Sequence, residues 1–310
     1  MPRINGSALL TALFIMTLVA IVATAMSTKV QLDIYRTKLI INHDKLYLAS
    51  QAVTFWALGE LSNKKNKFIH ANKQGIVSQY PKNMEHIDNT VTLNGALYDL
   101  QARFNLNNVV NKKAIFQFMN LINTIIPQTN ESERMKLALA LNDWLLLYDI
   151  ARGKDDYLSY YLTQKPAYHP SHQLMSSASE FRLVKEVNAS IYLALEPFIT
   201  ALPESTPINI NTAPIQILKS LSNTMNDSAL NELIMERKEN GIKDIGKISE
   251  ILKKLDIAPD QITLESTYFL NVAYAKSDNL NLTVYALLKR TRDKDGKTSV
   301  SIIRESFNVF

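Results

Sequence analysis

The 310-residue sequence contains no cysteine. It therefore cannot form a disulfide, a cysteine-ligated zinc site or a thiol nucleophile. Its five histidines show no metal-ligand spacing such as H-E-x-x-H; they are His43, His70, His86, His169 and His172. No serine–histidine–aspartate pattern, phosphate-binding loop or pair of carboxylates with a partner histidine stands out. The sequence thus predicts a protein that is not an enzyme.

Charge and proline are both missing from the first part of the chain. No charged residue occurs from Ser7 to Thr28, and no proline occurs from Ser7 to Tyr80. As a helix with a rise of ~1.5 Å per residue, the uncharged run is about 33 Å long, enough to cross a hydrocarbon core of ~30 Å. Apolar residues continue at helical spacing to Asn63, so we predict one helix of about 55 residues. Residues 7–28 would lie in a membrane and residues 29–63 beyond it.

Three interpretations of this N-terminal segment remain open. A secretory signal peptide would be cut near Ala23-Thr24-Ala25. A plain single-pass anchor would stay uncut. A short basic leader, residues 1–6, would be removed after Gly6, leaving Ser7 as the new amino terminus. We favour the leader, because the helical pattern runs on past the apolar stretch without a cleavage loop. Arg3 ahead of the stretch orients the amino terminus toward the cytoplasm, with the bulk of the protein on the other side.

The overall composition predicts a folded protein with a substantial core. Hydrophobic residues make up 46% of the chain and charged residues 20%, which excludes general disorder. The net charge is +5 and the lysines are scattered, apart from a small cluster at Lys64, Lys65 and Lys67. We interpret that cluster as a solvated helix end, since nucleic-acid binding needs basic residues gathered on one face.

Strand patterns lie on both sides of a long helical block. Asn94-Gly95, between alternating apolar residues of the segment 90–107, predicts a β-hairpin. Helical patterns follow from 112 to about 264. Three strand-like runs then follow from Tyr268, with turns at Asp278-Asn279 and Asp293–Gly296. We therefore predict an α+β fold in which the N-terminal helix packs on an antiparallel sheet formed by residues 64–110 and 265–310. An all-α domain, residues 111–264, is inserted between the strands.

An acidic segment at the end of one predicted helix is a candidate metal site. It contains Asp143, Asp149, Asp155 and Asp156, with Gly153 available for a sharp turn. Clustered carboxylates in a loop suit calcium, which takes 6–8 oxygen ligands. The spacing does not match an EF-hand, and helix capping with solvation remains an alternative.

Residues 207–255 resemble the helix-hairpin-helix modules of competence DNA receptors, a SAM-like all-α unit. The matching residues are Asn209, Asn211, Thr212, Ala213, Arg237, Glu239, Asn240 and Gly241. The hairpin itself departs from the pattern, because residues 222–227 read SNTMND where glycines belong. Those glycines let backbone N–H groups approach a phosphate, and Asp227 would repel it. We therefore expect the fold without nucleic-acid binding, and a membrane-anchored DNA receptor is the alternative function.

The chain as a whole resembles the protein K family of type II secretion systems, the large minor pseudopilins. The resemblance runs nearly end to end in long ordered strings. They span residues 6–15, 31–37, 98–110, 179–187, 194–203 and 206–218, together with the pair Asp143-Trp144.

This resemblance implies a place in a secretion machine. The protein would be a single-pass inner-membrane protein with its C-terminal bulk in the periplasm. Prepilin peptidase would cut between Gly6 and Ser7. The mature protein would act at the tip of the pseudopilus with the I and J minor pseudopilins, helping to initiate assembly and capping the filament. No small-molecule substrate is implied.

The resemblance also assigns residues. Thr11 stands at the fifth mature position, where most pilins carry glutamate, and Leu13 and Phe14 belong to the membrane and filament part of the helix. A subunit lacking that carboxylate suits a filament cap, because it would leave a neighbouring amine unpaired within the apolar core. The family binds calcium in its helical domain, which implies calcium at Asp143, Asp149, Asp155 and Asp156, although residues 145–148 replace several acids of the family's loop.

Overall fold

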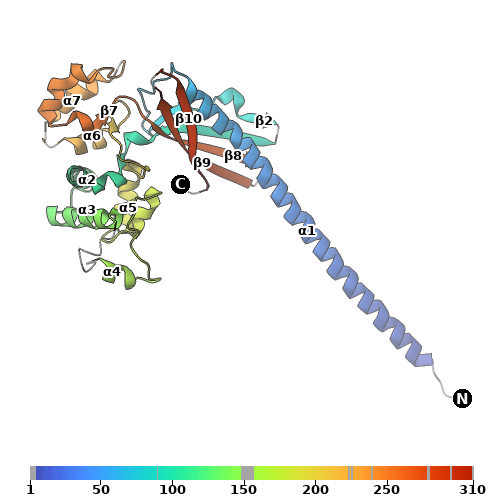
Figure 1. Ribbon diagram of the computed structural model, residues 1–310. Helices are drawn as coiled ribbons and strands as arrows, with labels where there is room; N and C mark the ends of the chain where they lie inside the picture. Colours follow the sequence, from blue (N-terminus) through green and yellow to red (C-terminus); the bar gives the residue numbers. More distant parts are fainter. Residues whose placement is uncertain are drawn as a thin grey trace.

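The computed structural model describes residues 5–88, 90–147, 157–222, 224, 226–238, 240–277, 280–293 and 295–308 (Figure 1). The helices are α1 (Asn5–Ser62), α2 (Lys112–Ile125), α3 (Glu131–Leu145), α4 (Leu158–Leu162), α5 (Ala189–Leu195), α6 (Ile215–Leu221), α7 (Asp227–Glu236) and α8 (Ser249–Leu255). The strands are β1 (Ile76–Gln79), β2 (His86–Asp88), β3 (Val91–Asp99), β4 (Phe104–Asn105), β5 (Ile199–Thr200), β6 (Ile208–Asn209), β7 (Ile262–Thr263), β8 (Tyr268–Ser277), β9 (Leu280–Arg292) and β10 (Thr298–Phe307).

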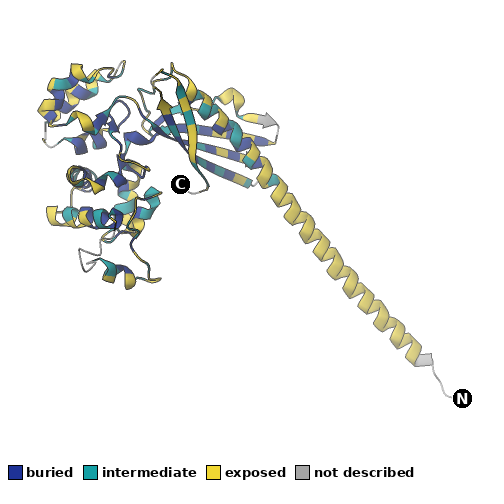
Figure 2. Cartoon of the chain, viewed as in Figure 1, coloured by how far each residue is buried: buried dark blue, intermediate teal, exposed yellow. Residues whose placement is uncertain are grey.

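Helix α1 is a single rod of 58 residues, which confirms the predicted long helix. The side chains from residue 7 to residue 41 are all exposed, and this part projects away from the rest of the molecule (Figure 2). Further along, Leu46, Val53, Ala57 and Leu61 are buried against the sheet. Helix α1 is thus half free rod and half part of a folded domain.

An antiparallel sheet of six strands lies under the second half of α1. Its order is β1-β3-β8-β9-β10, and β2 also pairs with β3. Strands β3 and β8 are neighbours, with Gly95 opposite Ala273 and Asp99 opposite Phe269. The two ends of the chain therefore meet in one sheet, as predicted.

The predicted hairpin at Asn94-Gly95 is wrong. Both residues lie inside β3, which continues unbroken to Asp99. Gly95 is needed there because a Cβ atom would lie 2.2 Å from Cγ1 of Val53 on α1. The glycine permits the close approach of helix and strand instead of a turn.

The helical domain is inserted between β3 and β8 as a separate lobe, confirming this feature of the predicted fold (Figure 1). Its core includes three aromatic side chains in contact: Phe104 lies 5.5 Å from Phe118, and Phe118 lies 5.9 Å from Phe181 between ring centroids. The lobe also holds two short parallel strand pairs, β4 with β5 and β6 with β7, which the sequence did not predict. The boundaries proposed for the domain, 111–264, stay a prediction.

The C-terminal strands match the predicted pattern. The turn between β9 and β10 is closed by a hydrogen bond of 3.0 Å from the Gly296 N–H to the Asp293 carbonyl. The other predicted turn, Asp278-Asn279, lies outside the described residues. Strands β1 and β2 were not predicted, because each is short and lies in a polar stretch.

Candidate functional site

The outward face of α1 carries large apolar side chains that the rest of the described chain does not cover. Ile34, Ile41, Leu48 and Phe55 recur every seven residues, and we call these four residues the α1 stripe. Leu48 and Phe55 are each 69% exposed. Seven residues are close to two helical turns, so the four side chains lie nearly in line along the rod.

The exposure of the α1 stripe contrasts with the opposite face of the same helix. Next to Leu48 and Phe55 in the sequence, Ala49 and Thr54 are buried against the sheet. Aligned, uncovered apolar side chains on a folded protein mark a surface for partners. The α1 stripe is therefore the candidate assembly surface.

The predicted amino-terminal residues all lie on the free rod. Gly6 and Ser7 are in its first turns, and Leu13 and Phe14 are exposed. The Thr11 hydroxyl donates to the Ser7 carbonyl at 3.1 Å and lies 3.0 Å from the Ala8 carbonyl. The hydrogen-bond donor of Thr11 is thereby satisfied within its own helix, so the side chain is compatible with an apolar environment. By length and composition, α1 could cross a membrane.

Of the predicted calcium residues, the structure describes Asp143 alone. It is half-buried in the last turn of α3. Burial raises the pKa of the nearby Tyr161 hydroxyl, and the negative charge of Asp143 adds to that shift. Asp149, Asp155 and Asp156 lie outside the described residues. Within the described part of the chain, no three acidic or histidine side chains gather in a way that would hold a metal. Calcium binding stays a prediction.

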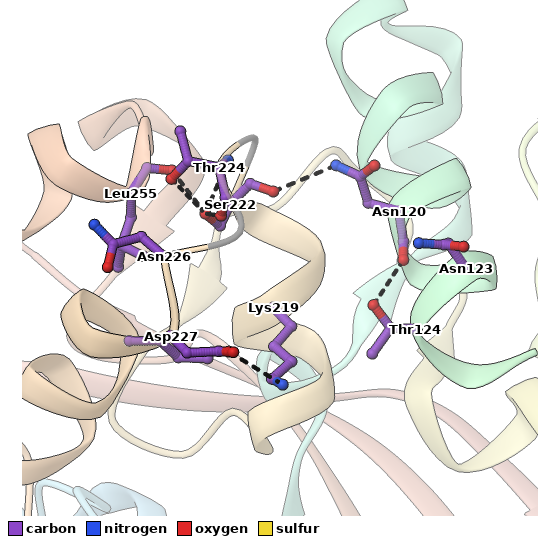
Figure 3. Close-up of a pocket in the computed structure, with 10 residues that line it drawn as sticks. Asn120, Asn123, Thr124, Lys219, Ser222, Thr224, Asn226, Asp227 and Leu255 are labelled. Atoms are coloured by element: carbon purple, nitrogen blue, oxygen red, sulfur yellow. Dashed lines mark hydrogen bonds and ion pairs between the residues drawn. The ribbon is translucent and has the colours of Figure 1, made fainter. Parts of the chain in front are cut away.

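In the turn that stands where a DNA-binding module has its glycine hairpin, side chains form hydrogen bonds with nearby backbone carbonyls (Figure 3). The Ser222 hydroxyl donates to the Leu255 carbonyl at 2.9 Å, and the Thr224 hydroxyl donates to the Lys254 carbonyl at 3.0 Å. Asp227, the first residue of α7, lies 3.5 Å from the Lys219 ammonium. A carboxylate therefore occupies the helix start where a phosphate would need free N–H groups and positive charge.

Two other residues that match the DNA-binding pattern form hydrogen bonds inside the lobe. The Arg237 guanidinium donates to the carbonyls of Ile210 at 3.0 Å and Ala213 at 2.6 Å, and burial lowers its pKa. The Asn211 amide donates to the Ile242 carbonyl at 3.0 Å and accepts from the Ile242 N–H at 2.7 Å. The resemblance is therefore carried by residues that shape the fold.

Gly241 completes this set of structural residues. Its φ is +64°, and a Cβ atom there would lie 2.8 Å from Cβ of Ile69, in the segment between α1 and β1. Glycine is thus required both by the backbone and by the contact. Glu239, which also matches the pattern, lies outside the described residues.

Sequence reasoning missed the α1 stripe as a site. Ile34, Ile41 and Leu48 fit the general helical pattern of the rod, and Phe55 was not singled out. The signal that could have found the α1 stripe is the regular seven-residue spacing, which continues past the point where the helix begins to pack on the sheet.

Comparison with known proteins gives consistent matches over this architecture. Two family models, both described as type II secretion system protein K, match residues 102–204 and 208–265, together more than half of the chain. Type II secretion system protein K of Pseudomonas aeruginosa is 26% identical over 96% of this chain and 91% of the relative. The protein K of Aeromonas hydrophila is 28% identical over 68% of this chain and 67% of the relative.

A solved structure shares the fold. It is a chain of the GspK-GspI-GspJ complex from the type 2 secretion system of enterotoxigenic Escherichia coli. The two chains are 21% identical with a TM-score of 0.70, and the match covers 89% of this chain and all of the other. The fold thus recurs in another protein over the matched part of the chain.

Proposed function

The chain belongs to the type II secretion system protein K family, and from that premise we propose that this minor pseudopilin helps to initiate the pseudopilus and caps its tip. Its task would be structural and not catalytic. The pseudopilus would then support protein export across the outer membrane.

The observation that carries the proposal is the α1 stripe. A rod whose one face packs on its own sheet, while its other face presents aligned apolar side chains, is suited to pack against further rods. The similar solved chain was crystallised in a complex with GspI and GspJ. We propose that the I and J minor pseudopilins of this chain's own system cover the α1 stripe.

The inserted lobe supports the capping role. It lies beside the sheet at the end of α1 that is far from the amino terminus (Figure 1). A lobe at this end would occupy the space that the next subunit of a growing filament needs. Thr11 supports the same role, since its hydroxyl is bonded within its own helix and offers no carboxylate to a neighbour's amine.

The same helix would serve as the anchor before assembly. We propose that prepilin peptidase removes residues 1–6, that Ser7 begins the mature chain, and that residues 7–28 hold the protein in the inner membrane with its bulk in the periplasm. The absence of charge from Ser7 to Thr28 supports this placement.

A calcium ion in the lobe is a second part of the proposal. Asp143 at the end of α3 supplies a half-buried carboxylate next to the segment that contains Asp149, Asp155 and Asp156. Oxygen ligands of this kind match the preference of calcium, and the bound ion would neutralise and order the acidic loop. No catalytic step depends on it.

The test of the proposed function is assembly with the partners. The full chain is co-expressed with the I and J minor pseudopilins, and the complex is isolated through a tag on one partner. Leu48→Glu and Phe55→Glu should each reduce recovery of the complex by at least roughly tenfold, since a charge would be buried against an apolar partner.

Met235→Glu is the matched control. Met235 is 66% exposed, on α7 of the lobe, so its substitution adds the same charge at a similarly exposed apolar position but leaves the rod intact. Recovery with Met235→Glu should equal that of the unmodified chain. If the two rod variants assemble as well as this control, the proposed assembly surface is wrong.

A further inference from the structure

The chain passes between sheet and lobe at two adjacent points. It leaves the sheet after Asp99, the last residue of β3, and returns just before Tyr268, the first residue of β8. The two crossings lie side by side, because Asp99 is opposite Phe269 in the register of β3 and β8. Two neighbouring connections of this kind form a natural hinge, about which a lobe would swing unless something fixes it.

The carboxylate of Asp99 lies at this hinge and is 2% exposed. Its Oδ2 accepts hydrogen bonds from the Thr212 hydroxyl at 2.6 Å, the Ser266 hydroxyl at 2.7 Å and the Asn209 amide at 3.0 Å. Its Oδ1 accepts from the Gln101 N–H at 2.9 Å. The Asp99 side chain thus connects three segments: the one that leaves the sheet after β3, residues 208–213 at the start of the helical module, and the one that returns to the sheet before β8.

Gln101 repeats the arrangement two residues further on. Its amide donates to the Pro207 carbonyl at 3.0 Å, and its side-chain oxygen accepts from the backbone N–H groups of Thr267 and Tyr268, the latter at 3.3 Å. An apolar cluster that includes Leu202, Tyr268 and Leu287 fills the adjoining space. Apolar packing is not directional, whereas hydrogen bonds are, so these polar groups are suited to fix the angle between lobe and sheet.

We propose that Asp99 is a positioning residue that makes the two connections between sheet and lobe rigid. We call these two connections, together with the hydrogen bonds of Asp99, the mount. The mount holds the lobe at one angle to the sheet and α1. A buried carboxylate is tolerated when its lone pairs are filled, and the donors to Asp99, a sheet residue, come from the two crossings and from the lobe. A swing of the lobe would pull Asn209 and Thr212 from the carboxylate and leave it buried and under-bonded. The mount therefore resists rotation more strongly than packing alone.

This role gives a reason for the motif shared with DNA-binding modules. Asn209 and Thr212 belong to that motif, and here they bind a carboxylate of the same chain. Gly241, also of the motif, contacts Ile69 beside the end of α1. The motif residues hold the module against the sheet in place of holding a nucleic acid.

The angle of the lobe can be measured directly, because the chain has no cysteine to interfere with labelling. Gln79→Cys on β1 and Lys136→Cys on α3 place one label on the sheet and one on the lobe, both at exposed positions. Pulsed electron–electron double resonance on the full chain in detergent gives the distribution of label distances. The unmodified mount should give one narrow distribution.

Asp99→Asn should broaden that distribution and accelerate hydrogen exchange at the Gln101 and Tyr268 amides by at least roughly tenfold, because an amide has one acceptor oxygen where the carboxylate has two. Thr212→Val removes a single donor and should broaden the distribution less. It keeps the test decisive if Asp99→Asn does not fold, since an unchanged distribution with Thr212→Val would then overturn the proposal.

Asp244→Asn is the matched control. Asp244 also accepts a backbone N–H two residues on, from Gly246 at 2.9 Å, but it is exposed and lies within the lobe alone. The Asp244→Asn variant should leave the distribution of label distances narrow.

Exchanging the carboxylate of Asp99 with the side-chain amide of Asn209 separates an effect on the lobe angle from a general loss of stability. Asn209→Asp alone would place two carboxylates about 3 Å apart in a buried site and should broaden the distances. Combining it with Asp99→Asn restores one carboxylate and one amide, and should narrow them again. If folded Asp99→Asn protein keeps the narrow distribution, or the double variant is as broad as the worse single variant, Asp99 does not set the angle.

Discussion

Gly95→Ala tests the packing of the rod on the sheet. The added Cβ would lie 2.2 Å from Cγ1 of Val53, 3.2 Å from the Val272 carbonyl oxygen and 3.4 Å from Cβ of Tyr80. The first contact is far inside van der Waals range, so α1 must move or Val53 must leave its rotamer. Overpacking of this kind costs about 1–3 kcal/mol, against about 0.5–1 kcal/mol gained by replacing a strand glycine. We expect a net loss of stability of about 0.5–2 kcal/mol.

Val53→Ala supplies the rescue. Alone it removes fully buried methyl groups and should cost about 2 kcal/mol. In its background, however, the clash with Cγ1 is gone, and Gly95→Ala should be close to neutral. The coupling between the two substitutions should therefore equal the cost of Gly95→Ala alone, about 0.5–2 kcal/mol.

Urea unfolding of the full chain in detergent measures these differences. Trp56 on α1 reports the interface, since its ring lies 5.6 Å from that of Tyr80. Trp144→Phe in all four proteins leaves Trp56 as the one tryptophan of the chain. If Gly95→Ala is at least as stable as the parent, or if the two substitutions are simply additive, the close approach of α1 and β3 is not what selects glycine.

Three further predictions concern the lobe and its junction with the sheet. Arg237→Met should destabilise the lobe by about 2–4 kcal/mol, measured by urea unfolding, because two carbonyls lose a charged donor, and a gel shift should show no tight duplex DNA binding by either protein. The Lys289 ammonium, 2.8 Å from the Glu204 carboxylate, holds the pKa of Glu204 below its usual range, so the stability from this pair should be present at neutral pH and lost as pH falls below about 4. Since the pair is partly exposed, Lys289→Met should cost at most about 1 kcal/mol, and it should reduce that pH dependence while the Tyr268 hydroxyl still donates to Glu204. Calorimetry with calcium should show saturable uptake that Asp155→Asn with Asp156→Asn weakens, and no uptake by the unmodified chain would eliminate the calcium proposal.

The sequence predicted the parts of the fold that depend on local patterns. The charge-free stretch and the lack of proline gave α1 nearly to its residue bounds, because helix formation needs no distant partner. The alternation from Tyr268 onward gave β8, β9 and β10 for the same reason. The insertion of a helical lobe followed from the order of these patterns along the chain.

The errors and omissions concern contacts between distant segments. Gly95 fits a turn by its local sequence, and its actual reason, the side chain of Val53, lies 42 residues away in the chain. Asp99 lies in a string that identified the family, yet its partners Asn209, Thr212 and Ser266 come from more than 100 residues further on. No local periodicity predicts such a carboxylate to be buried.

The candidate site was predicted only in part, because the rest of it also depends on contacts between distant segments. The rod and its amino-terminal residues could be read from composition. Which face of the rod stays open could not, because that depends on how the sheet packs against Leu46, Val53 and Ala57.

We propose that the apolar rod stays attached to the mature protein and serves as both anchor and assembly surface. Mass spectrometry of the mature amino terminus, after expression with prepilin peptidase, decides whether it does. We expect a chain that begins at Ser7. A chain that begins near Met26 has lost the membrane-crossing part of the rod and would contradict it.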